Sequence, residues 1–173
     1  GQIPFEDTRI AFEDFPALKA NLPFQQLPVM EIDGEIIAQS GAMERYAAKL
    51  VGLYPTDALQ AARVDMVVGA VSDVLDAAVG IHHMKDNEEL KQEKIQKMLN
   101  ETLPKLLGGI QKQLKGTFLL GEQLSYADVV FYAILQHGVD GKIPGFSWDA
   151  YPGLKTTFEA VKALPTIAAY EHK

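Results

Sequence analysis

This sequence contains no cysteine among its 173 residues. That absence excludes disulfide bonds, thiol nucleophiles and cysteine-ligated metals, and it is typical of a reducing compartment, so we expect a cytoplasmic protein. No apolar run approaches the roughly 20 residues that a membrane-spanning helix requires. No secretory signal peptide is recognisable either. The sequence therefore predicts a globular chain without membrane attachment.

The chain also has fewer basic than acidic residues. The chain carries 23 acidic and 16 basic residues, a formal net charge of −7. Nucleic acids and anionic lipid surfaces repel such a chain, so neither is expected as a partner. The imbalance is largest in residues 1–57, which hold nine acidic and four basic side chains. An anionic ligand bound there must depend on a few placed cations and on backbone N–H groups.

Convincing strand signals are confined to the first 50 residues. We expect a strand over 3–10, a short helix within 12–20 and a strand that begins at Leu27. Asp33-Gly34 is a strong hairpin signal, and 35–38 forms the returning strand. Ser40 is expected to be the N-cap of a helix that ends near residue 50.

From Asp57 onward no convincing strand appears, and the regular elements expected are helices. Asp57 is expected to cap a long helix that ends near His82, with Asn87 opening the next one. Pro104 should kink that second helix, and Ser125 with Asp128 forms a capping box. Closing helices are expected near 152–163 and 166–170. The apolar positions of the long helix recur at spacings of three and four: Val64, Val67, Val68, Val71, Leu75 and Val79.

Several of these features occur together in one known family. Gln26-Leu27-Pro28, the hairpin and Gln39-Ser40 follow one another at its spacing, with Phe15 to Lys19 upstream and Leu124 to Asp128 downstream. The chain resembles the cytosolic glutathione transferases of the sigma-like class over essentially its whole length. The resemblance implies an α/β plus all-α fold and a homodimer. The expected parts are an incomplete thioredoxin-like domain over 1–50, a linker over 51–57 and an all-helical domain over 58–173.

The resemblance also implies a site for glutathione, a tripeptide with two carboxylates. Gln39 and Ser40 would hold the γ-glutamyl carboxylate at a helix N-terminus, where anions are stabilised. Leu27 would offer its peptide groups to the cysteinyl backbone, next to Gln26 and a cis Pro28. Lys19 would pair with the glycyl carboxylate and Phe15 would pack against that glycine. Taken singly, these residues also fit a plain N-cap, a surface amide, a trans edge-strand proline and a solvated lysine.

On the long helix the resemblance singles out Asp73, which would reach the γ-glutamyl amine of a ligand bound to the partner subunit. In the prostaglandin D synthase branch this helix carries three acids that support a metal. Gly69 and Ser72 replace two of them here, so no metal is expected. The second-substrate pocket would be lined by Leu75, Ala78, Val79 and His82. His82 and His83 are alternatively a cationic cap of the helix C-terminus.

The catalytic tyrosine of the family is expected at the end of a first strand, and this sequence offers no counterpart. Its first tyrosine is Tyr46, inside a predicted helix. The first strand and helix of the thioredoxin-like domain would precede Gly1. We therefore expect either a fragment of an ordinary enzyme, which is favoured, or a truncated and inactive chain.

Two functions follow from the resemblance. The first is conjugation of the glutathione thiol to small hydrophobic electrophiles, with prostaglandin-type isomerisation as a related activity. The second is a non-catalytic binding or structural role, as in lens crystallins related to this class. Glutathione is the only co-substrate expected.

Overall fold

The computed structural model describes residues 3–171 and separates into two compact units, which meet in sequence between Tyr54 and Pro55. Each unit has its own internal packing and is considered by itself. Gly1, where the sequence predicts the end of a helix, lies outside the described residues.

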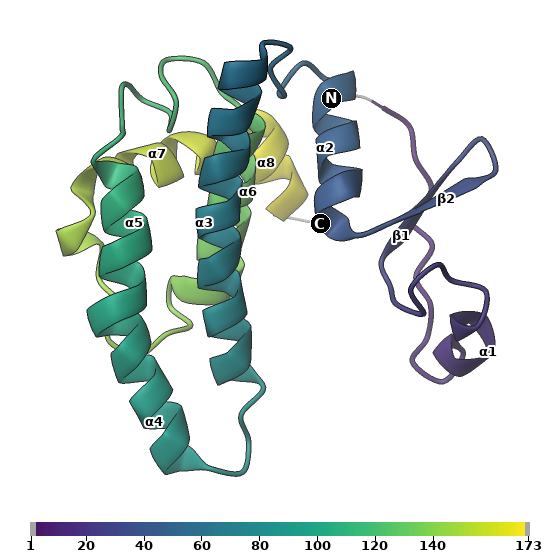
Figure 1. Ribbon diagram of the computed structural model, residues 1–173, viewed down its shortest axis with the longest axis horizontal. Helices are drawn as coiled ribbons and strands as arrows, with labels where there is room; N and C mark the ends of the chain where they lie inside the picture. The colour runs from purple at the N-terminus through teal and green to yellow at the C-terminus, as the bar shows by residue number, and fades with distance from the viewer. Residues whose placement is uncertain (1–2, 172–173) are drawn as a thin grey trace. The chain divides into compact units, whose positions relative to one another are not determined.

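Unit 1 consists of a β-hairpin flanked by two helices. Its elements are α1 (Phe15–Lys19), β1 (Val29–Ile32), β2 (Glu35–Ala38) and α2 (Ser40–Leu50) (Figure 1). The two strands pair antiparallel, from Val29 opposite Ala38 to Ile32 opposite Glu35. Both turn residues have positive φ, 52° at Asp33 and 86° at Gly34, as a type I′ hairpin requires. The predicted hairpin is confirmed.

The strand predicted over residues 3–10 is wrong, because this segment has no regular structure. Ile3, Phe5 and Ile10 are all exposed, so the apolar positions of the segment gain no buried face. No described strand pairs with it, and an isolated strand leaves its peptide groups unsatisfied. For the same reason β1 begins at Val29 rather than at Leu27, where the hairpin has no opposing residue.

The start of α2 also differs from the expectation. Ser40 is the first helical residue and not the N-cap, a position that Gln39 takes without any side-chain cap bond. Gln39 has φ 73° and ψ 113°, a rarely populated conformation for a residue other than glycine. In that conformation its carbonyl oxygen accepts hydrogen bonds from the backbone N–H groups of Ala42 and Met43, at 2.9 and 3.2 Å.

Unit 2 is helical throughout its regular structure. Its α-helices are α3 (Ala58–His82), α4 (Glu88–Lys97), α5 (Leu103–Gln111), α6 (Tyr126–Ile134), α7 (Pro152–Lys162) and α8 (Pro165–Glu171). Short π-helical segments η1 (Met98–Thr102) and η2 (Leu135–Val139) follow α4 and α6, and a 3₁₀ turn η3 (Trp148–Ala150) precedes α7. The long first helix and the two closing helices are therefore confirmed to within a few residues.

The core of unit 2 forms around α3, which packs against α5 and α6 (Figure 1). The buried side chains of α3 are Val64, Val67, Val68, Val71, Val74, Ala78 and Ile81. Leu75 is only half-buried and Val79 is 41% exposed, so these two positions of the periodic pattern lie outside the buried stripe. The buried stripe includes residues 71, 74, 78 and 81, and the helical period of about 3.6 residues is compatible with several such stripes. The positions of α5 and α6 determine which of these stripes is buried.

The predicted helix starts of unit 2 are confirmed. The Asp57 carboxylate accepts a hydrogen bond from the Gln60 N–H at 2.9 Å, and the Asn87 side chain accepts one from the Leu90 N–H at 2.9 Å. Asp128 and Ser125 form the capping box that opens α6. Pro104 is preceded by η1, in which the Leu103 N–H bonds to the carbonyl of Met98 five residues back. Pro104 itself has no N–H to donate, and the wider π-turn before it accommodates this missing hydrogen bond.

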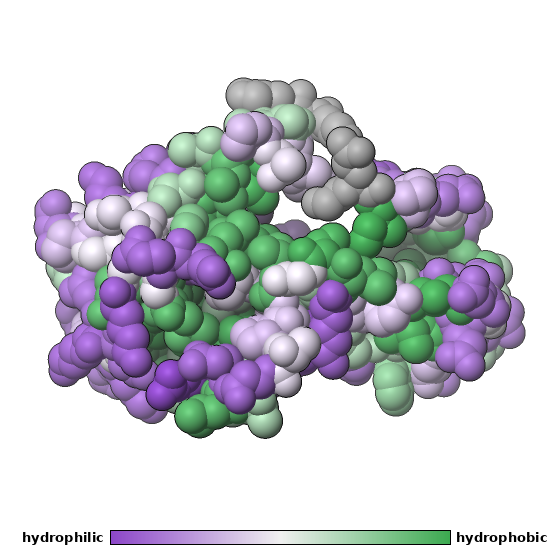
Figure 2. Space-filling view, turned by 90° about the horizontal axis from the view of Figure 1, so that it is seen from above, coloured by the Kyte–Doolittle hydropathy of each residue, from purple (hydrophilic) through white to green (hydrophobic). Residues whose placement is uncertain are grey.

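Apolar residues are visible among polar ones over the face shown in Figure 2. In unit 1 the exposed apolar side chains include Phe5, Phe12 and Phe24, and Ala48 is the one described residue of that unit that is fully buried. Among the helices of residues 3–171, none is long and apolar enough to cross a bilayer.

Candidate functional site

A small cleft in unit 1 brings together residues that lie far apart in the sequence. Gln26, Leu27 and Pro28 form one wall, and Gln39 with Ser40 forms the other. Phe24 and Ala38 complete the lining of a cavity of about 70 Å³. The hairpin produces this arrangement, because Val29 pairs with Ala38 and so places the residue before β1 next to the residue after β2. The Leu27–Pro28 peptide bond is cis, as predicted.

Ser40 presents hydrogen-bonding groups that nothing else uses. Among the described residues its hydroxyl makes no hydrogen bond, and it is not the cap of the helix, because Gln39 occupies the cap position. The first N–H groups of any helix lack partners within the helix. Together with the positive end of the helix dipole, they make this wall of the cleft suited to a carboxylate. Leu27 lies outside the strand ladder, so its peptide groups are also open to a ligand.

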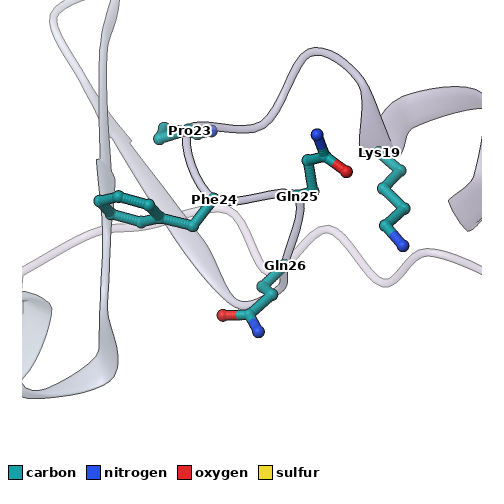
Figure 3. Close-up of a pocket in the computed structure, with 5 residues that line it drawn as sticks. All are labelled: Lys19, Pro23, Phe24, Gln25 and Gln26. Atoms are coloured by element: carbon teal, nitrogen blue, oxygen red, sulfur yellow. The ribbon is translucent and has the colours of Figure 1, made fainter.

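A second, more open hollow adjoins the cleft and shares Phe24 and Gln26 with it. Lys19, Pro23 and Gln25 complete its lining, and its volume is about 360 Å³ (Figure 3). Lys19 has no ion pair among the described residues, and no acidic side chain lines the hollow. The two hollows thus place a free cation at one end and a helix N-terminus at the other, as a ligand with two carboxylates requires.

The sequence predicted most of this site but not four of its lining residues. The residues that line the hollows but were not predicted for the site are Pro23, Phe24, Gln25 and Ala38. Gln25 is distinguished from an ordinary loop amide by its positive φ, which the sequence does not reveal. Phe15 lines neither hollow and instead begins α1 as a half-buried residue.

The site residues predicted on α3 lie in unit 2. Asp73 is exposed and Leu75 is half-buried, whereas Ala78 has no exposed surface. Its methyl group lies near Gly138 of η2, where an added Cβ would be 3.8 Å away. Ala78 is therefore part of the core in this structure and does not present a surface to a ligand.

His82 is the last residue of α3 and is engaged within its own unit. Its Nε2 lies 3.0 Å from the backbone carbonyl oxygen of Gly138, to which it donates when protonated at that nitrogen. His83 is the C-cap residue. Across residues 3–171 no group of three or more histidine, cysteine or acidic side chains is placed to hold a metal ion.

The groups with shifted pKa values belong to unit 2, and none of them lines either hollow. Burial raises the pKa of Asp128, although hydrogen bonds from Leu119 and Ser125 act in the opposite direction. Burial also raises the pKa of Tyr132, with a further contribution from the Glu171 carboxylate, and burial alone raises the pKa of Tyr151. These groups are structural, and the proposed ligand chemistry does not involve them.

Comparison with known proteins assigns both units to one family. The family model "Glutathione S-transferase, N-terminal domain" matches residues 2–49, and "Glutathione S-transferase, C-terminal domain" matches residues 72–173. The chain belongs to the glutathione S-transferase family. Glutathione S-transferase S1 of Drosophila melanogaster is 31% identical over 176 residues, which cover 100% of this chain and 70% of that protein. Hematopoietic prostaglandin D synthase of Gallus gallus is 30% identical and covers 99% of this chain and 84% of that protein.

Solved structures of glutathione S-transferases share the fold. The glutathione S-transferase of Ascaris lumbricoides superposes with a TM-score of 0.84 at 29% identity and covers 98% of this chain and 84% of that one. Prostaglandin synthase D of Nilaparvata lugens gives a TM-score of 0.83 at 29% identity, over 99% of this chain and 85% of that one. The predicted fold class, with its short hairpin unit and its helical unit, is confirmed.

This family is a family of enzymes, and its co-substrate is glutathione. The family's thiol-activating tyrosine has no counterpart in the cleft: Tyr46 lies within α2, as predicted, and does not line either hollow.

Proposed function

We propose that this chain binds glutathione along the two hollows of unit 1 and, as a glutathione transferase, directs the thiol to small hydrophobic electrophiles. The observation that carries the proposal is the cleft itself, in which Leu27 and Pro28 face Gln39 and the unpartnered hydroxyl of Ser40. A cleft of about 70 Å³ is too small to enclose a tripeptide, so the ligand would lie along the surface and extend towards Lys19.

Each end of glutathione then has a matching group. Ser40, Gln39 and the first N–H groups of α2 would hold the γ-glutamyl carboxylate, because charge-assisted hydrogen bonds to a helix N-terminus are strong. The peptide groups of Leu27 would pair with the cysteinyl residue. Lys19 would pair with the glycyl carboxylate, with Gln26 between the two ends and Phe15 packed near the glycine.

Two further features belong to the same proposal. Asp73 would complete the site of a partner subunit in a homodimer by facing the γ-glutamyl amine. Leu75, Val79 and His82 would contribute to the pocket for the electrophile, with Ala78 behind them in the core. The reaction itself requires a thiolate, since the thiol is the weaker nucleophile at neutral pH.

Isomerisation of a prostaglandin-type endoperoxide is the second candidate activity. It is favoured by the relatives and solved structures named prostaglandin D synthase, one of which, from Gallus gallus, covers nearly the whole chain. An isomerisation would use the same glutathione site, but it would release glutathione unchanged, whereas conjugation leaves glutathione bound to the product through a new thioether bond.

The decisive experiment is calorimetric titration of the chain with glutathione. Ser40→Ala removes the hydroxyl that faces the ligand carboxylate, and we expect about tenfold weaker binding, because a hydrogen bond to a charged group contributes about 1.5 kcal/mol. Ser147→Ala is the matched control, since that hydroxyl accepts a bond from the Asp149 N–H in unit 2.

The outcomes separate the hypotheses. Equal affinity for the parent chain and Ser40→Ala would contradict the site assignment. Binding followed by turnover of an activated aryl halide supports the transferase, and turnover of a prostaglandin endoperoxide supports the isomerase. Binding with no turnover of either substrate would favour a non-catalytic member of the family.

A further inference from the structure

Gln25 occupies an unusual position in the wall of the larger hollow. Its φ is 54°, in the left-handed region that few residues other than glycine adopt. The turn that imposes this conformation is held by a hydrogen bond from the Gln25 N–H to the carbonyl oxygen of Leu22, at 3.1 Å. A glycine would satisfy the turn without the steric cost of a Cβ, so the side chain at this position calls for a separate explanation.

The side chain lies where a ligand carboxylate would arrive. Gln25 lines the hollow together with Lys19 and Gln26. Figure 3 shows Gln25 beside Lys19, whereas the ring of Phe24 points to the other side of the loop. The Gln25 amide and the Lys19 ammonium both line this hollow, and an amide N–H₂ and an ammonium that turn towards the same ligand suit the two oxygens of a carboxylate.

The charges of unit 1 support an anionic occupant. Three of its four cations, Arg9, Arg45 and Lys49, contact a nearby carboxylate, a backbone carbonyl and an aromatic ring respectively. Lys19 makes no such contact among the described residues, and the groups that share the hollow with it are apolar or are neutral amides. In an acidic unit, an unpaired cation beside amide donors favours an anion over a neutral group.

We infer that Gln25 is a specificity-determining residue, which reads the glycyl carboxylate of glutathione together with Lys19. The inference rests on the proposed function, because it assigns one more contact to the same ligand. Its consequence is that Gln25 contributes only when the glycyl end carries a free carboxylate.

The test compares two ligands that differ only at that end, glutathione and its glycyl ethyl ester, by calorimetric titration of the chain. Gln25→Gly removes the amide and relieves the positive φ, so it leaves the fold intact. We expect it to weaken glutathione binding about three- to tenfold and to leave the affinity for the ester unchanged. Gln25→Glu keeps the shape but repels a carboxylate, so it should weaken glutathione binding more than Gln25→Gly and leave the ester nearly unaffected.

Ser40→Ala is the control for the opposite end of the ligand. It should weaken both ligands by the same factor, because both carry the γ-glutamyl carboxylate. Equal losses for the two ligands in Gln25→Gly, or no loss for either, would overturn the role of Gln25 while leaving the proposed glutathione site in place. Failure of the parent chain to bind either ligand would overturn the proposed function and this inference together.

Discussion

Asp128 shows how much one side chain can organise. It has no exposed surface, and one carboxylate oxygen accepts bonds from both the N–H and the hydroxyl of Ser125, at 2.8 and 2.7 Å. The other oxygen accepts the N–H of Leu119 at 2.7 Å. A single carboxylate therefore caps α6 and also holds the preceding loop against it. Burial raises the pKa of this group, which reflects the cost of removing its charge from water.

We expect Asp128→Ala to lower the free energy of unfolding by about 3 kcal/mol, because it leaves two buried N–H donors without partners. Urea unfolding followed by far-UV circular dichroism measures the change. Asp149→Ala removes an exposed carboxylate from the same unit, and it should change stability by less than about 0.5 kcal/mol. Similar losses in the two variants would show that the buried network contributes little.

At the scale of the element, α3 is the helix on which unit 2 is assembled. It is 25 residues long, and its buried stripe faces both α5 and α6. The helix begins where Asp57 accepts the Gln60 N–H, so the cap determines where the stripe starts. A long helix of this kind is stabilised mainly by its packed face, and the cap adds a smaller local contribution.

Asp57→Ala should therefore lower the free energy of unfolding by about 1 kcal/mol, through loss of the cap. Asp57→Asn keeps the oxygen acceptor and should cost only a few tenths of a kcal/mol. Thermal unfolding of both variants distinguishes the hydrogen bond from the charge, since equal destabilisation would mean that the negative charge at the helix N-terminus dominates. Asp86→Ala, next to the cap of α4, is the control and should be nearly neutral.

At the scale of the whole molecule, our proposal is that the glutathione site is shared between two copies of the chain. Asp73 is the residue that carries this expectation. It is exposed on α3 and makes no bond among the described residues that would explain its presence there.

We expect Asp73→Asn to weaken glutathione binding about fivefold, because an exposed carboxylate paired with an amine contributes about 1 kcal/mol. Asp76→Asn is the matched control, since Asp76 is exposed one turn further along the same helix. Titration at two protein concentrations, one above and one below the dimer dissociation constant, completes the test. An effect of Asp73→Asn that persists in the monomer would show that the carboxylate acts within its own chain.

Local features were predicted well. The Asp33-Gly34 hairpin, the caps at Asp57 and Asn87, and the capping box of Ser125 depend on hydrogen bonds between residues no more than four apart, which the sequence places together directly. The cleft was also largely predictable, because a two-residue hairpin turn forces the residues on either side of the two strands to meet. Gln25 was not predicted, because its proposed role depends on a positive φ that the residue type does not indicate.

Features that depend on remote contacts were decided by the tertiary structure. The segment over 3–10 has the composition of a strand but no partner to pair with. Ala78 is packed towards Gly138, and His82 contacts the same residue, more than 50 positions further along the chain. Burial of Val74 in place of Val79 follows from the helices that face α3. The sequence by itself determined the Asp33-Gly34 turn and the helix starts at Asp57, Asn87 and Ser125, because those hydrogen bonds are local; only packing between distant elements decided which side chains enter the core and which stay open to a ligand.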